Sequence, residues 1–112
     1  MQVPLYEAKA EFFRMLGHPV RIRVLELLQD GAKPVRDLLT AIEVEPSNLS
    51  QQLAVLRRSG IVTATRTGST VMYELAGGDV AELLAAARRI LSVLAASRRE
   101  LLDELRVTES AQ

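Results

Sequence analysis

The sequence contains no cysteine, no tryptophan, a single histidine and only 4% aromatic residues in its 112 positions. Without cysteine, disulfides, thiolate metal sites and thiol catalysis are excluded. The longest apolar run, Leu83 to Ala87, is far too short to cross a membrane. Charges recur near the N-terminus, where a secretion signal would need an apolar stretch. We therefore expect a cytoplasmic protein with no membrane partner.

Length and composition describe an ordinary globular chain, with 48% hydrophobic and 25% charged residues. Leucine, valine, isoleucine and alanine must fill its core, because aromatics are so scarce. One histidine, no cysteine and no glycine-rich phosphate loop leave no catalytic constellation, so we do not expect an enzyme. We expect one domain over residues 1–106 and a frayed tail over 107–112.

Apolar residues recur at helical spacing in five segments. The pattern predicts helices over residues 5–16, 19–29, 34–42, 46–58 and 79–106. Pro19 and Pro46 suit first helical turns, whereas Gly17 and Gly60 suit helix ends. About three residues join the third and fourth helices, which is the spacing of a helix-turn-helix.

After Gly60 the apolar period changes from helical to alternating. Residues 61–66 and 70–75 read as strands, joined by a turn at Thr67-Gly68-Ser69. A helix-turn-helix followed by a hairpin and a long helix is the order of a winged helix. We predict a mainly α fold with one β-hairpin, in the order four helices, two strands and a final helix, forming a homodimer through the terminal helices.

Charge is distributed unevenly, although fourteen basic residues balance fourteen acidic ones. No acidic residue lies between Glu45 and Glu74, where three arginines are found, which indicates a surface for an anion. The outward face of the fourth helix carries Ser, Asn, Gln and Arg, whose side chains can bond base edges and phosphates. Neither this helix nor the hairpin tip offers an aromatic for stacking on unpaired bases, which favours duplex DNA. The predicted DNA contacts are Ser47, Asn48, Ser50, Gln51, Arg57, Arg58, Arg66, Ser69 and Thr70.

The last predicted helix carries a second apolar strip, whose residues alternate in steps of four and three. Such a helix is about 40 Å long, more than the width of so small a domain. We therefore expect the strip to pack against a second copy in a coiled-coil-like seam, completed by the first helix. The predicted dimer residues are Leu5, Phe12, Leu84, Ala87, Leu91, Leu94, Leu101 and Leu105.

Three segments, residues 16–28, 49–62 and 66–75, resemble the ArsR/SmtB family of bacterial regulators in sequence, order and spacing. The resemblance extends over about residues 5–106. It implies a dimeric winged-helix repressor that binds a palindromic operator. It also implies release of the DNA when an effector, commonly a metal ion, binds.

The departures from this resemblance concern the sensor. Metal-sensing members carry a Cys-x-Cys-Asp-Leu box, and the matching residues here are Pro34-Val35-Arg36-Asp37-Leu38. Other members use Asp and His pairs on the last helix, which has no histidine here. Ser69 stands where many relatives have a cation. The segments that the resemblance assigns to DNA binding are present in this sequence, whereas the residues of the usual sensor are not.

His18 is the only histidine, and it precedes Pro19 at a helix start. We interpret it as a residue of helix initiation and packing in preference to a metal ligand. The alternative is a nickel or zinc site built from this imidazole and carboxylates, which both ions accept.

Two other functional hypotheses remain open. The zero net charge and the few wing cations leave room for a winged-helix module that binds another protein. Weak DNA binding that salt does not change would favour that hypothesis. A regulator of this kind could also act without an effector, or an effector could bind through a partner protein.

Overall fold

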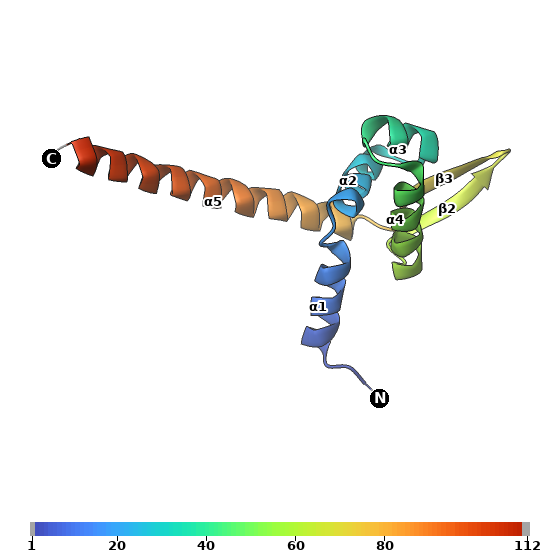
Figure 1. Ribbon diagram of the computed structural model, residues 1–112. Coiled ribbons are helices and arrows are strands. Elements are labelled where there is room, and N and C mark those ends of the chain that lie inside the picture. The colour runs from blue at the N-terminus through green and yellow to red at the C-terminus, as the bar shows by residue number, and fades with distance from the viewer. Residues whose placement is uncertain (1, 111–112) are drawn as a thin grey trace. The chain divides into compact units, whose positions relative to one another are not determined.

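The computed structural model describes residues 2–110, and Figure 1 follows their helices and strands in chain order. The chain divides after Val80 into two compact units. The first contains α1 (Leu5–Leu16), α2 (Pro19–Leu27), the 3-10 turn η1 (Leu28–Asp30), β1 (Lys33–Pro34), α3 (Val35–Ala41), α4 (Pro46–Ser59), β2 (Val62–Thr67) and β3 (Thr70–Leu75). Helix α5 (Asp79–Ser110) supplies the described residues of the second. The predicted winged-helix order is confirmed.

The core of the first unit is aliphatic, as the shortage of aromatics requires. Leu25 of α2, Leu38 of α3 and Leu49 and Leu56 of α4 are completely buried. Burying one such side chain contributes about 1.5–3 kcal/mol. Because all three helices contribute to the same core, α4 is fixed against α2 and α3 along one face, and its opposite face is left to solvent.

Strands β2 and β3 form the predicted hairpin, which Figure 1 shows projecting from the helices of the first unit. Their antiparallel register pairs Val62 with Leu75 and Thr67 with Thr70, so the loop consists of Gly68 and Ser69 alone. Gly68 has φ +64°, which a residue without a Cβ adopts without strain. The turn is therefore one residue tighter than predicted, because Thr67 still belongs to β2.

A third strand was absent from the prediction. Strand β1 consists of Lys33 and Pro34, which pair antiparallel with Tyr73 and Met72 of β3. The sheet order is therefore β1-β3-β2. A strand this short has no alternating pattern to detect in the sequence, and its proline reads as a helix start.

Several helix ends also differ from prediction. Helix α3 ends at Ala41 instead of residue 42, and α4 ends at Ser59 instead of residue 58. The second helix tightens into η1 at Leu28 instead of continuing as an α-helix to residue 29. Helix α5 continues past the predicted end at Arg106 to Ser110, while 111 and 112 of the predicted frayed tail lie outside the described residues. Across residues 2–110, no helix combines the length and apolar character that a membrane span requires.

Candidate nucleic-acid interface

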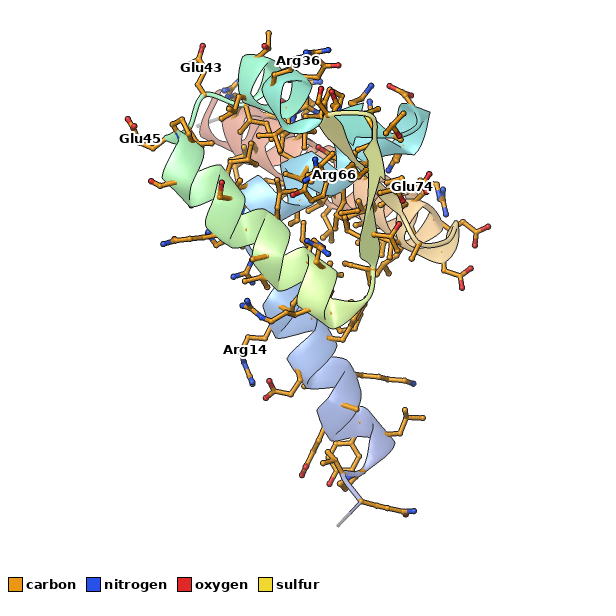
Figure 2. The ribbon with its side chains drawn as sticks, turned by 90° about the vertical axis from the view of Figure 1, so that its right-hand side faces the viewer. Arg14, Arg36, Glu43, Glu45, Arg66 and Glu74 are labelled. Atoms are coloured by element: carbon orange, nitrogen blue, oxygen red, sulfur yellow. The ribbon has the colours of Figure 1, made fainter. Side chains whose placement is uncertain are left out.

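Helix α4 places the predicted base-reading residues on its solvent face. Leu49, Leu53 and Leu56 are buried, as their spacing predicts, so the opposite face of the helix points outward. The helix stops at Gly60, whose φ of +88° lets the chain turn directly into the hairpin. Figure 2 shows α4 at the front of the first unit, with side chains reaching into solvent. Its exposed polar residues are Ser47, Ser50, Gln51, Arg57, Arg58 and Ser59.

Asn48 differs from these residues because it is only half-exposed and already has a partner. Its Oδ1 accepts a hydrogen bond of 2.9 Å from Nε2 of Gln52, one helical turn away. Gln52 is 7% exposed and is the one buried polar residue among those the structure describes. Sequence reasoning missed this glutamine, although an asparagine four residues before a glutamine on a helix is a pair that can bond.

The hairpin carries the remaining predicted contacts. Arg66 and Ser69 are exposed, and Thr70 is half-buried. Arg66 pairs with Val71 across the ladder, next to the turn. In Figure 2, α4 and the hairpin that carries Arg66 both face the viewer. The fold therefore brings the helix and hairpin parts of the predicted contact set to one side of the first unit.

The arginines of this surface are not neutralised within the chain. In the described part of the chain, the guanidinium groups of Arg57, Arg58 and Arg66 take part in no ion pair. Arginines elsewhere in the first unit do have carboxylate neighbours: Arg14 with Glu11, Arg23 with Glu26 and Arg36 with Asp37. An exposed, unpaired guanidinium is available to bind phosphate, often through two parallel hydrogen bonds.

Acidic residues mark the limits of this basic stretch. Figure 2 shows Glu43 and Glu45 at the N-terminal end of α4 and Glu74 on the strand that returns from the hairpin tip. Glu45 is the residue that precedes the first turn of α4, where a carboxylate interacts favourably with the helix dipole. The positive charge is therefore concentrated on the later turns of α4 and on the hairpin.

His18 takes the helix-initiation role that the sequence indicates. It is the N-cap of α2, and its Nδ1 accepts a hydrogen bond of 3.2 Å from the backbone N–H of Val20. This hydrogen bond engages Nδ1 in capping the first turn of α2. Among the side chains that the structure describes, no group of three His, Asp or Glu could hold a metal. These side chains of one chain therefore do not fit the metal site that the resemblance implies.

Replacing His18 by alanine should lower the free energy of unfolding by about 1 kcal/mol, because the first turn of α2 loses its side-chain cap. The effect should be the same in chelator and in added nickel or zinc. His18→Asn should restore most of the lost stability, because asparagine is a good cap. Stabilisation of the wild-type protein by either ion, absent from His18→Ala, would contradict this assignment.

The predicted dimer residues are exposed to different degrees in the single chain. On α5, Leu91 and Leu94 are 65% and 59% exposed, and Leu101 and Leu105 are also more than half exposed. Ala87 is exposed and Leu84 is half-buried. On α1, Leu5 is exposed and Phe12 is half-buried. Most of this apolar surface is therefore exposed to solvent in the single chain.

Comparison with known proteins identifies the family. The model of the bacterial regulatory protein, arsR family, matches residues 18–64. The HTH-type transcriptional regulator Rv0081 of Mycobacterium tuberculosis is 50% identical over 109 residues, which cover 96% of both chains. The crystal structure of Rv0081 has a TM-score of 0.79 and 51% identity, covering 87% of this chain and 98% of that one.

A second solved structure is described as the homodimeric winged helix-turn-helix DNA-binding domain of Mb0332 from Mycobacterium bovis. It is 31% identical, has a TM-score of 0.69, and covers 79% of this chain and 82% of that one. Curated relatives that match over most of this chain are named as HTH-type transcriptional regulators and not as enzymes. The chain belongs to the arsR family of bacterial regulatory proteins, and it is a DNA-binding, winged helix-turn-helix transcription regulator.

Proposed function

We propose that the protein acts in the cytoplasm as a homodimer that recognises a specific, two-fold symmetric sequence in duplex DNA. The observation that carries this proposal is the solvent face of α4, where serine, glutamine and arginine side chains are exposed together and no acidic residue intervenes. Such a face suits the major groove, where amide and guanidinium groups read base edges.

The homodimer is supported by the apolar surface left exposed on α1 and α5. Tyr6 and Phe13 of α1 are 73% and 55% exposed, in addition to the leucines of α5. A soluble domain covers a continuous apolar strip of this kind, and a second copy of the same strip is the simplest cover. A dimer with two-fold symmetry presents two α4 helices, and its half-sites lie about 34 Å apart, one turn of DNA.

Within each half-site, affinity and specificity have separate sources. Arg57, Arg58 and Arg66 bind phosphates, which fixes the register without reading sequence. Gln51 is the exposed amide on α4 and can bond adenine through both its oxygen and its nitrogen. Ser47 and Ser50 precede it on the exposed side of α4 and contribute hydroxyl contacts to bases or phosphates.

Gln51→Ala should therefore weaken binding to the preferred duplex by about 1–3 kcal/mol, roughly ten- to a hundredfold. Its binding to random DNA should change little, because phosphate contacts remain. Fluorescence polarisation with both duplexes measures the two affinities. Gln29→Ala, which removes an exposed glutamine from η1, is the matched control and should leave both unchanged. Equal loss on both duplexes would show that Gln51 does not read a base.

The effector is a separate element of this proposal. A nickel or zinc ion would need ligands from both protomers, since the described side chains of one chain hold no suitable group. A regulator without an effector, or one controlled through a partner protein, needs no such site. Titrating either ion into the DNA complex separates these cases: a change in operator affinity that chelator reverses would establish a metal effector.

The alternative is a winged-helix module that binds another protein through the same face. It predicts weak DNA binding that is equal for all sequences and insensitive to salt. Selection of duplexes from a randomised pool distinguishes the two functions directly. Recovery of one consensus with two inverted half-sites supports the operator-binding dimer, whereas recovery of no consensus supports the protein-binding module.

A further inference from the structure

The buried side chain of Gln52 interrupts the leucine face of α4 and links it to α2. Its Oε1 accepts a hydrogen bond of 2.8 Å from Nε of Arg21, thirty-one residues earlier in the chain. Its Nε2 donates to Oδ1 of Asn48. Both ends of the amide are therefore engaged, although burying an amide is unfavourable unless it is hydrogen-bonded. No buried side-chain N or O in the described residues lacks a partner.

Arg21 is itself held in place from a second side. Its Nη1 donates a hydrogen bond of 2.8 Å to the backbone carbonyl of Met15, in the last turn of α1. Carbonyls in the last turn of a helix have no partner within the helix, so this contact also satisfies the end of α1. The guanidinium is thus fixed between α1 and α4 before any DNA is present.

The chemistry of the groups gives this chain of hydrogen bonds a single direction. Arginine has donors and no acceptor, so the atom of Gln52 that faces Arg21 must be its oxygen. The amide nitrogen of Gln52 then faces Asn48, and a nitrogen that donates requires the oxygen of Asn48 to face it. The remaining group of Asn48, its Nδ2 amino group, is the one turned away from Gln52.

We propose that Arg21 and Gln52 orient the Asn48 amide so that α4 offers DNA a hydrogen-bond donor, and not an acceptor, at this position. This inference rests on the proposed function, because it assumes that Asn48 faces a base. Arg21 and Gln52 are positioning residues and do not touch the DNA themselves.

The orientation limits which bases Asn48 can read. In the major groove a donor is matched by guanine O6 and N7, thymine O4 or adenine N7, whereas the exocyclic amino group of cytosine is a donor and is rejected. The two-bond contact of asparagine with adenine needs both amide atoms turned toward the base, whereas the bond from the buried Gln52 holds Oδ1 toward the covered face of α4. Guanine, with two acceptors on its edge, is the best match for Asn48, and adenine recognition is left to Gln51.

Gln52→Glu tests the direction of the chain. A carboxylate still accepts from Arg21 but cannot donate to Asn48, so the Asn48 amide must turn and donate inward. Its oxygen then faces the DNA. We expect the preference at one base pair of each half-site to change from an acceptor-bearing base to cytosine or to the adenine amino group, by about tenfold in relative affinity. Duplex selection followed by polarisation on single-base variants measures this shift.

Two further variants separate orientation from simple loss of structure. Asn48→Asp places only acceptors at this position and leaves the Arg21–Gln52 bond intact. It makes the same change of charge as Gln52→Glu, and it should shift the preference at the same base pair toward the same bases. Gln52→Met fills similar space without polar atoms, and should lower affinity without creating a new preference. Thermal melting of each variant establishes that it is folded.

Each outcome bears on a different claim. If the wild-type protein selects no consensus, the proposed function fails and this inference fails with it. If the wild type selects a consensus but folded Gln52→Glu leaves the preference unchanged at the base pair that Asn48→Asp shifts, the operator function stands and the inference is overturned. If Gln52→Glu does not fold, Gln52→Met decides the question, because it removes the group that orients Asn48 and should weaken the preference at that base pair.

Discussion

Leu94→Glu on α5 is expected to separate the dimer into monomers and to weaken binding to a duplex with two half-sites by about a hundredfold or more. Leu94 is 59% exposed in the single chain and lies within the apolar strip. Placing a carboxylate in an apolar seam, with no partner for its charge, is strongly unfavourable. In the dimer, binding of one half-site holds the second α4 helix close to the other half-site, which raises the overall affinity. Separate monomers lose this gain.

Ala96→Glu is the matched control for this variant. Steps of 100° per residue place Ala96 on the opposite side of α5 from the strip, so the same charge is added where no partner is expected. It should remain dimeric and keep its operator affinity. Sedimentation velocity gives the oligomeric state, and a duplex with one half-site should bind all three proteins alike. A monomeric wild-type protein, or a dimeric Leu94→Glu, would contradict the proposed interface.

The sequence predicted the structure best where the spacing of apolar residues and the positions of glycines indicate the same helix or strand. The spacing of Leu49, Leu53 and Leu56 predicted which face of α4 is buried. Three leucines in one narrow arc of a helix can all be removed from water only when that face packs against the core. Gly60 and Gly68 predicted the end of α4 and the hairpin turn, since both adopt positive φ. With these fixed, the outward position of Ser47, Gln51 and Arg58 followed from geometry.

The features that escaped prediction depend on contacts between distant residues. The bond from Arg21 to Gln52 joins two helices, and the spacing of residues within either helix does not indicate it. Strand β1 exists only because Lys33 and Pro34 meet β3. Periodicity reports a residue's relation to its own helix or strand, and it carries no information about such pairings. The dimer interface is predictable in the same limited sense: the strip is visible in the sequence, but its partner is not.

Replacing Arg57, Arg58 and Arg66 together by alanine is the other change with a large expected effect. Each guanidinium is exposed and unpaired within the described residues, so in the complex each is expected to neutralise one phosphate and release its counterions. Three contacts in each protomer make six in the dimer. The slope of log K against log salt should therefore become shallower by about 5, and affinity at low salt should fall about a thousandfold or more.

This loss should be independent of sequence, which distinguishes it from the loss caused by Gln51→Ala. Specific and random duplexes should weaken by similar factors, because phosphates carry no base information. Alanine at Lys9, Arg14 and Arg23 makes the same change of charge on α1 and α2, and should reduce the slope far less. If instead the two triple variants reduce the salt slope equally, DNA binding depends only on the overall charge of the protein. That result would contradict the assignment of α4 and the hairpin as the DNA interface. An unchanged slope in both would favour the protein-binding module, because a winged helix that docks on protein has no counterions of DNA to displace.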